Sequence, residues 1–322
     1  MTDTSRSSNA VPVRSVCASA LDLIGDTPLV ALQRIHPGPG AVLAKAEFLQ
    51  PGGSLKDRPA RWILQEAYRT GRLVAGQPVV EMTSGNMGAG LAVVCNVLGN
   101  PFIAVMSAGN SPERAKMMRC LGAEVVLAPQ VDGAPGQVTG ADIDAAAKRA
   151  AQLARERGGY YVDQFNNPGS VRAHHESTGP EIWRALGGRL DAFVAAVGTG
   201  GTFVGTARFL KGRKPAIVCA AVEPVGSEVL AGKPVVKAKH VLQGTGYGYV
   251  PTQWDPQLAD TFLAVSDEEA TLYRTLLATR ESLHVGFSAA ANVCAAVKLA
   301  KSGALGPAPT VVTLLPDTGF KY

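Results

Sequence analysis

Short apolar segments alternate with longer segments of helical periodicity along most of the chain. The apolar segments predict strands at residues 41–49, 79–82, 102–106, 125–127, 160–162, 192–197, 217–222 and 310–315. The segments between and after them predict helices at residues 57–70, 89–98, 112–121, 141–157, 171–185, 203–210, 267–280 and 288–301. Strands that are each followed by a helix are typical of parallel sheets covered on both faces, so we expect an α/β fold.

Length and composition narrow the class of protein. The 322 residues, 46% of them hydrophobic, suffice for two domains or one large α/β domain. The net charge of +5 comes without a long basic run or interleaved aromatic and basic residues, so we expect no nucleic-acid partner. The first ten residues are polar and no segment is long and apolar enough for a membrane helix, which predicts a cytoplasmic protein without membrane contact.

The cysteines give no sign of a disulfide framework or a metal site. Their number is odd and none forms a Cys-x-x-Cys pair. The five cysteines are Cys17, Cys95, Cys120, Cys219 and Cys294, and most of them lie in apolar segments and are predicted to be small core residues. We therefore predict no metal.

The stretch Pro51-Gly-Gly-Ser-Leu-Lys-Asp-Arg-Pro59 places Lys56 at the start of a predicted helix. Proline is tolerated in a first helical turn because its missing N–H costs nothing there. A cation at this point faces the positive end of the helix dipole, which disfavours the charged form. The position suits a lysine whose amine acts as a nucleophile, although a solvated surface lysine is the alternative.

Two loops between a predicted strand and a predicted helix have the composition of anion sites. The loop Thr83-Ser-Gly-Asn-Met-Gly88 offers hydroxyls and helix-start amides to a carboxylate, although a simple N-cap cluster has the same composition. The loop Val197-Gly-Thr-Gly-Gly-Thr202 has the glycines of a phosphate site, although close packing alone also explains them. It is neither a Walker A loop nor a complete dinucleotide fingerprint.

A lysine suited to a Schiff base, a carboxylate loop and a phosphate loop together indicate pyridoxal 5'-phosphate (PLP) with an amino-acid substrate. In the same residues the chain resembles the cysteine synthase / cystathionine β-synthase family of fold-type-II PLP enzymes. The matching motifs occur in family order over nearly the whole chain: IGDTPLV at Ile24, GGSLKDR at Gly52, TSGNMG at Thr83, SPERAKMMRCLGAEVV at Ser111, QFNNP at Gln164, STGPEIW at Ser177, GTGGT at Gly198, VEP at Val222, QGTGYGYVP at Gln243 and LPDTGFKY at Leu315.

The resemblance implies a tryptophan synthase β-like fold with two doubly wound α/β domains and mostly parallel sheets. A smaller mobile domain at residues 46–160 would carry the asparagine loop and bind the substrate carboxylate. Residues 1–45 and 161–322 would form a larger domain that binds the PLP phosphate. The family also implies a homodimer.

The resemblance assigns roles residue by residue. Lys56 would be the Schiff-base lysine, Asn86 would hydrogen-bond the PLP ring hydroxyl, and Thr318 would lie opposite the pyridine nitrogen. A neutral hydroxyl at that nitrogen favours loss of a β-substituent over transamination. The phosphate would be held by Gly198, Thr199, Gly200, Gly201 and Thr202. The substrate would be bound by Thr83, Ser84, Gly85, Met87, Gln164, Gly244 and Tyr247.

The implied activity is PLP-dependent β-replacement on an activated L-serine, which is O-acetylserine, O-phosphoserine or serine. Lys56 would remove the α-proton, the β-substituent would leave to give an aminoacrylate intermediate, and a small nucleophile would add. One alternative is β-elimination without replacement, as in a dehydratase or desulfhydrase. Others are a cystathionine β-synthase-like condensation, a non-catalytic homologue that binds a partner's peptide, and a nicotinamide-dependent dehydrogenase.

Departures from the family pattern bear on the second substrate. Met87 stands where cysteine synthases usually have threonine, and Tyr247 stands where they commonly have alanine. The Gly-Tyr pair at Tyr247 instead resembles cystathionine β-synthases, so the product is either cysteine or a specialised β-substituted alanine. His284 is either a pocket base or a surface residue, and His174 and His175 are expected to be structural.

Overall fold

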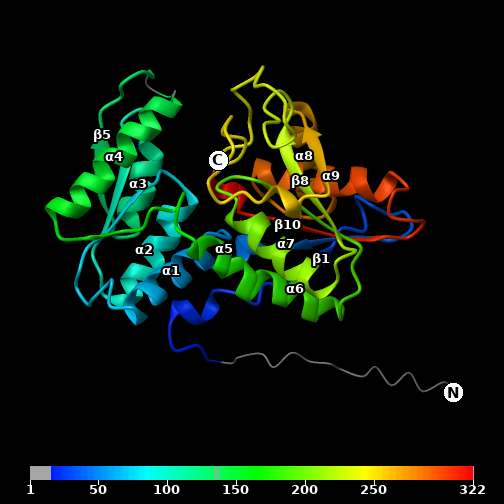
Figure 1. Ribbon diagram of the computed structural model, residues 1–322, viewed down its shortest axis with the longest axis horizontal. Helices are drawn as coiled ribbons and strands as arrows, with labels where there is room; N and C mark the ends of the chain where they lie inside the picture. Colours follow the sequence, from blue (N-terminus) through cyan, green and yellow to red (C-terminus); the bar gives the residue numbers. More distant parts are fainter. Residues whose placement is uncertain (1–15, 135, 137, 322) are drawn as a thin grey trace.

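Two separate sheets organise the chain in this computed structural model, which describes residues 16–134, 136 and 138–321 (Figure 1). The six-stranded sheet has the order β1-β2-β10-β7-β8-β9. Its strands are β1 (Leu29–Ala31), β2 (Ala41–Lys45), β7 (Ala192–Ala196), β8 (Val218–Pro224), β9 (Thr261–Val265) and β10 (Thr310–Leu314). Among these strands β1 pairs antiparallel with β2, and the other pairings are parallel. The polar first ten residues, on which the cytoplasmic prediction rests in part, lie outside the described residues.

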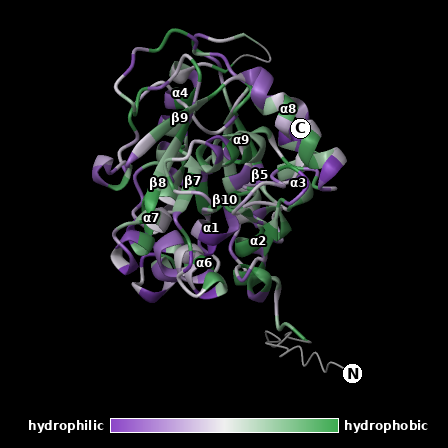
Figure 2. Cartoon of the chain, turned by 90° about the vertical axis from the view of Figure 1, so that its right-hand side faces the viewer, coloured by the Kyte–Doolittle hydropathy of each residue, from purple (hydrophilic) through white to green (hydrophobic). Residues whose placement is uncertain are grey.

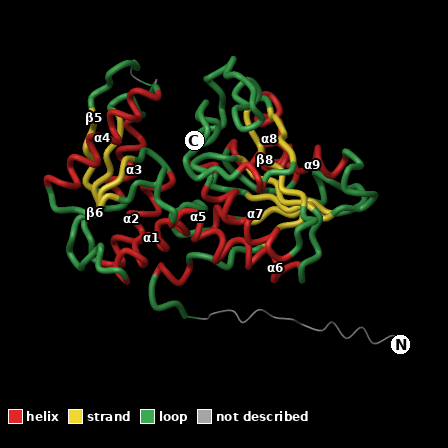
Figure 3. Tube along the Cα trace, in the orientation of Figure 1, coloured by secondary structure: helices red, strands yellow, loops and turns green. Residues whose placement is uncertain are grey.

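The four-stranded sheet is parallel throughout and has the order β5-β4-β3-β6. Its strands are β3 (Val79–Met82), β4 (Phe102–Ser107), β5 (Glu124–Ala128) and β6 (Tyr160–Tyr161). Figure 3 shows the two groups of strands lying apart, each with helices around it. The predicted α/β fold with mostly parallel sheets is confirmed.

Helices cover both faces of the six-stranded sheet, and the alternation of side chains along each strand explains why. In β7, Ala192 and Val194 pack with α8 (Asp267–Arg280) and α9 (Phe287–Lys301). The intervening Phe193 and Ala195 pack with α6 (Gly179–Leu186) and α7 (Gly201–Arg213) on the other face. Strands buried on both sides have no polar face to show to water, and Figure 2 shows them in mostly hydrophobic colours.

The four-stranded sheet is also covered on both faces. Helices α1 (Asp57–Arg69), α2 (Asn86–Leu98) and α3 (Pro112–Cys120) share one apolar cluster with Val79 and Phe102. Helix α4 (Gly140–Glu156) packs on the other face, against Val80 and Ile103. Cys95, Cys219 and Cys294 are buried as predicted, whereas Cys120, at the end of α3, is exposed.

The predicted helix at 171–185 is built from three segments. These are α5 (Gly169–Ala173), a π-helical turn at His174–Thr178 and α6. A π-helical turn adds a residue to the helical repeat, and such turns occur often at functional sites. Sequence periodicity did not reveal this turn, nor did it reveal β1 and β9 at the two edges of the larger sheet.

The predicted strand at 41–49 ends early because Glu47 turns inward. Strand β2 stops at Lys45, and a 3₁₀ turn follows at Glu47–Leu49. Glu47 is 1% exposed and pairs with Arg58 of α1, whose guanidinium also contacts Glu181 of α6. Lys45 Nζ lies 2.7 Å from Glu181 Oε2, so two cations and two carboxylates are buried together.

The buried network balances its charges within the protein. Burial raises the pKa of Glu47, but the charge and hydrogen bonds of Arg58 outweigh it and lower the pKa to about 2. A carboxylate with a lowered pKa contributes stability that is complete above pH 4.5 and is lost as the pH falls towards 2. The network joins the strand β2 region to α1 and α6 and thereby fixes the start of α1.

Replacing Glu181 by alanine should destabilise the protein by about 3–5 kcal/mol, because Lys45 and part of the Arg58 guanidinium then lose their buried partner. Chemical denaturation followed by circular dichroism measures this change. Glu156→Ala, at an exposed ion pair with Arg149, is the matched control and should leave the denaturation midpoint almost unchanged. Equal effects of the two substitutions would contradict the structural role of the network.

Candidate active site

The loop that carries Lys56 is paired with the C-terminal segment. Leu55 N donates to Pro316 O at 2.8 Å, and Thr318 N donates to Gly53 O at 3.2 Å. Ser54 and Asp317 form an isolated antiparallel bridge between these contacts. The last described residues, in red in Figure 1, accordingly lie between the two groups of strands. Residues more than 260 positions apart, Lys56 and Thr318, are therefore brought to one place.

Lys56 immediately precedes α1, as the sequence predicted. Its side chain keeps some exposed surface, but the surrounding protein lowers the pKa of its amine to about 8 by desolvation. Within the described part of the chain no carboxylate pairs with the Lys56 amine. About a tenth of this amine is therefore without its proton at pH 7 and about half at pH 8, far more than for an ordinary lysine, and a nucleophile or base requires this form.

The Thr83 loop leads from β3 directly into α2, which begins at Asn86 rather than at the predicted residue 89. Thr83 is 4% exposed, and its Oγ1 accepts from Gly88 N at 3.0 Å. Ser84 Oγ accepts from the Arg114 guanidinium of α3 at 3.2 Å. Because the hydroxyls of Thr83 and Ser84 accept in these hydrogen bonds, each still has its own hydrogen to donate. Gly85 immediately precedes α2, and the space where its Cβ would lie is open.

Asn86 lies beside the C-terminal segment. Its Nδ2 donates to Asp317 Oδ2 at 2.7 Å, and its Oδ1 accepts from Lys321 Nζ at 2.8 Å. Thr318 is partly exposed next to this group, and a Cβ at Gly53 would contact its methyl group at 3.2 Å. Lys56, Asn86 and Thr318 are thus assembled by the same contacts between the N-terminal loops and the C-terminal segment.

The glycine-rich loop lies between β7 and the first turn of α7, as predicted. Gly200 has φ +92°, a left-handed conformation that favours glycine. A Cβ at Gly201 would lie 2.7 Å from the Ser170 side chain, and a Cβ at Gly198 would collide with the Gly244 carbonyl. Because these three positions are glycines, no side chain covers the backbone N–H groups at the start of α7 there. Thr199 and Thr202 add hydroxyls to the same loop.

His174 supports the end of this loop. Its Nε2 lies 3.1 Å from Thr202 Oγ1 and its Nδ1 lies 2.8 Å from Thr178 Oγ1. Burial, with a smaller contribution from the charge of Arg58, lowers the pKa of His174 to about 3, so the ring is neutral. His175 instead packs edge-on against Phe209 at 5.7 Å. Sequence reasoning treated both histidines as structural and missed the contact of His174 with Thr202.

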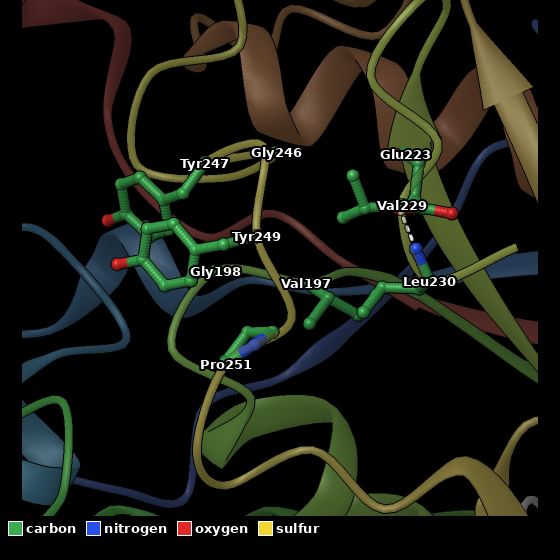
Figure 4. Close-up of a pocket in the computed structure, with 9 residues that line it drawn as sticks. All are labelled: Val197, Gly198, Glu223, Val229, Leu230, Gly246, Tyr247, Tyr249 and Pro251. Carbon is green, nitrogen blue, oxygen red and sulfur yellow. Dashed lines mark hydrogen bonds between the residues drawn. The ribbon is translucent and has the colours of Figure 1, made fainter. Parts of the chain in front are cut away.

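The loop at 243–249 lies against the glycine-rich loop, since Gly246 N donates to Val197 O at 3.3 Å. Tyr247 stacks on Tyr249 with centroids 5.7 Å apart and contacts Phe165 at 5.8 Å. Figure 4 shows the two tyrosine rings on one side of a small, partly open pocket, with Glu223 on the other. Gly198, Gly246 and Pro251 also line this pocket.

Two of the predicted substrate-binding side chains are engaged elsewhere. Met87 is 3% exposed and packs in the core beside α1 and α3. Gln164 donates through Nε2 to Glu81 Oε1 at 3.3 Å and to Met82 O at 3.1 Å. Burial raises the pKa of Glu81 to about 8. In this arrangement Met87 is a core residue, and Gln164 offers an oxygen rather than an N–H.

His284 lies at the outer edge of this group, where its backbone O accepts from Gly319 N at 3.0 Å. It is exposed, follows Ser282 with its φ of 59°, and stacks on the exposed Phe320 at 4.8 Å. Of the two hypotheses for His284, the surface residue describes its position. The residues that sequence reasoning missed, Arg114, Asp317 and Lys321, all lie inside the motifs that it used. Their proximity depends on tertiary contacts, so no local pattern marks them.

Among the described helices none is both long and apolar enough to cross a membrane. This finding concerns only the described part of the chain.

Comparisons with known proteins place these motifs in one family. The family model named "Pyridoxal-phosphate dependent enzyme" matches residues 20–317. The chain is 41% identical over 313 residues to a Bacillus subtilis protein named "Probable cysteine synthase", covering 95% of this chain and 96% of that protein. It is 37% identical over 302 residues to a cysteine synthase of Staphylococcus aureus, covering 93% of each.

Solved structures agree with the sequence comparison. A hydrogen sulfide-producing enzyme from Fusobacterium nucleatum superposes with a TM-score of 0.88 at 34% identity, covering 97% of this chain and 99% of that one. An O-ureido-L-serine synthase superposes with a TM-score of 0.86 at 36% identity, covering 95% of this chain and 93% of that one. The similarity extends over nearly the whole chain in each case.

The Lys56 amine should react with acetic anhydride along a pH profile centred near 8, because only the neutral form is nucleophilic and burial lowers its pKa to that value. Reactivity should rise as the pH passes upward through this midpoint, whereas ordinary exposed lysines follow with a midpoint of about 10.4. Peptide mass spectrometry of the ligand-free protein after a short pulse gives both profiles from one sample. A Lys56 profile that coincides with the surface lysines would disprove the desolvated amine.

Proposed function

Because the chain belongs to the pyridoxal-phosphate-dependent enzymes of the cysteine synthase / cystathionine β-synthase family, we propose that it catalyses β-replacement on an activated L-serine. The observation that carries this proposal is the desolvated Lys56 amine, without a carboxylate partner among the described residues, beside the Thr83 loop and the C-terminal segment. Covalent attachment of the cofactor requires such an amine, and so does removal of the substrate α-proton.

The residues present fit PLP. Lys56 supplies the amine for covalent attachment, and the start of α7 supplies backbone N–H groups, with Thr199 and Thr202, for the phosphate. Asn86 keeps one Nδ2 hydrogen without a partner among the described residues, which suits the ring oxygen. Thr318 offers a neutral hydroxyl to the pyridine nitrogen. When bound, PLP supplies the electron sink that makes the substrate α-proton acidic.

Lys56 then acts as the base. With its pKa lowered to about 8, the Lys56 Nζ would be about half unprotonated at pH 8 and would be able to accept the substrate α-proton and later return it. A fully solvated lysine with a pKa of about 10.4 would hold its proton at neutral pH and do this poorly.

The substrate carboxylate is proposed to bind at the Thr83 loop. Thr83 and Ser84 both have a hydroxyl hydrogen to donate, and the N–H groups at the start of α2 add a favourable dipole. Gly85 allows the carboxylate to approach the backbone closely. Gln164 would donate an N–H to the carboxylate only after breaking its hydrogen bond to Glu81 or to Met82 O. Met87 would support the loop by packing in the core beneath it.

The nucleophile is proposed to enter beside the 243–249 loop, at Gly244 and Tyr247. Tyr247 is fixed between Tyr249 and Phe165, so this side of the site presents rigid aromatic surface with hydroxyls. Figure 4 shows both tyrosine hydroxyls pointing to the same side, away from Glu223. Such a surface fits a specialised nucleophile at least as well as sulfide, and a cystathionine β-synthase-like condensation stays a candidate.

We also propose that residues 46–160 move as a smaller domain against residues 1–45 and 161–322, with closure over the substrate. The separate four-stranded and six-stranded sheets support this division. A homodimer is proposed from the family resemblance, and a cytoplasmic location from the polar start of the sequence and its lack of long apolar segments. Sedimentation of the purified protein measures the oligomeric state.

Lys56→Ala should abolish β-replacement and the visible absorbance of covalently bound PLP, because the variant lacks the amine proposed to attach the cofactor and to move the proton. The wild-type protein is offered O-acetylserine, O-phosphoserine or serine, each with sulfide, homocysteine or a hydroxyurea-type nucleophile, and products are identified by mass spectrometry. Full activity of Lys56→Ala would overturn the assignment of Lys56. Formation of 2-oxo acid and ammonia regardless of nucleophile would replace β-replacement by elimination.

His174→Leu should weaken PLP binding by about tenfold, because Thr202 then loses the hydrogen bond that orients its hydroxyl. The neutral ring suits a chain in which Thr178 donates to Nδ1 and the Nε2 hydrogen is donated to Thr202, leaving the Thr202 hydrogen for the phosphate. Equilibrium dialysis against PLP measures the effect. His175→Leu is the matched control, and a comparable loss in that variant would indicate a general packing defect.

A further inference from the structure

Asn86 lies between two side chains of opposite charge, both from the C-terminal segment. Its Nδ2 donates to Asp317 Oδ2 at 2.7 Å, and its Oδ1 accepts from Lys321 Nζ at 2.8 Å. Both distances are short for neutral hydrogen bonds and typical of charge-assisted ones. The side chains come from the segment 317–321, more than 230 residues from Asn86 in sequence.

These two partners determine the orientation of the amide. An ammonium group can only donate and an ionised carboxylate can only accept, so the oxygen of Asn86 must face Lys321 and its nitrogen must face Asp317. A flipped amide would place N–H groups against Lys321 and an oxygen against Asp317, two repulsive contacts. Asn86 therefore has one stable orientation before any ligand binds.

Lys321 is itself held in place from a second side. Its Nζ donates to Gly52 O at 2.7 Å, and Gly52 N donates in turn to Asp57 Oδ2 at 2.5 Å. Its carbon chain packs against Gly53, where a Cβ would lie 3.3 Å from Lys321 Cε. A side chain larger than hydrogen at Gly53 would therefore disturb Lys321. The lysine joins the Lys56 loop, Asn86 and the C-terminal segment.

We propose that Asp317 and Lys321 are positioning residues that hold the Asn86 amide so that its remaining Nδ2 hydrogen faces the ring oxygen of PLP. This inference rests on the proposed function and on Asn86 as the residue at that oxygen. Neither charged residue needs to touch the cofactor for this role. The hydrogen bond from Lys321 also polarises the amide and makes its N–H groups stronger donors.

The positioning has a physical benefit because a free asparagine samples both amide orientations and several rotamers. Fixing these before the cofactor arrives moves the entropy cost from binding to folding. A donor held in advance is also oriented correctly when charge on the ring oxygen changes during the reaction. The contribution of Lys321 should consequently be visible in PLP affinity and not only in turnover.

The test is a double-mutant cycle on PLP binding with Asn86→Ala and Lys321→Met, read by equilibrium dialysis. Lys321→Met keeps the carbon chain and removes the ammonium, and should weaken PLP binding by about tenfold. If Lys321 acts through Asn86, Asn86→Ala combined with Lys321→Met should bind PLP no more weakly than Asn86→Ala alone. Lys321→Arg, which can still donate to Oδ1, should recover most of the loss.

The visible absorbance of bound PLP provides a second readout, because it responds to the hydrogen bond at the ring oxygen. Lys321→Met should shift this band, whereas Lys301→Met, at an exposed lysine on α9, should leave both the band and the affinity unchanged. Circular dichroism of each ligand-free variant verifies that it is folded.

Two results would overturn the role of Lys321 while leaving the proposed function intact. One is wild-type affinity and absorbance in Lys321→Met. The other is a loss in Lys321→Met that adds in full to that of Asn86→Ala, which would indicate an effect through Gly52 instead. A wild-type protein that takes up no PLP would overturn the proposed function itself, so the two failures are distinguishable.

Discussion

The backbone contacts between residues 53–55 and residues 316–318 are the constraint on which the site depends. Through them Leu55 and Thr318 are hydrogen-bonded to partners from the other end of the chain, immediately before and opposite Lys56. The pairing brings the loop of the desolvated Lys56 amine to the same place as Asn86, Asp317 and Lys321.

Charged side chains near α1 include several that are paired with an opposite charge and one, that of Lys56, that is not so paired within the described part of the chain. Behind the helix, Lys45, Glu47, Arg58 and Glu181 neutralise one another and hold the helix in place. Immediately before its first residue, Lys56 has no partner of opposite charge among the described residues, and desolvation lowers the pKa of its amine. A desolvated amine without a partner of opposite charge costs stability, and this amine lies next to a network whose charges are balanced.

Local sequence patterns predicted a large part of the fold because parallel strands buried on both faces are mostly apolar. The strands at 79–82, 192–196 and 310–314 follow this rule and were predicted closely. The pattern failed where a tertiary contact overrode it. Strand β2 ends early because Glu47 turns inward to Arg58, and the helix after residue 169 contains a π-helical turn that places His174 beside Thr202.

The sequence by itself determined the α/β class, the position of two loops between a strand and a helix and, through its motifs, the PLP family and the reaction class. These follow from residue types at short spacing, since glycines, hydroxyls and a helix start act locally. Only the tertiary structure decided which side chains serve those loops. Met87 packs into the core, Gln164 donates to Glu81, and Lys321 orients Asn86, because each depends on contacts between segments distant in the sequence.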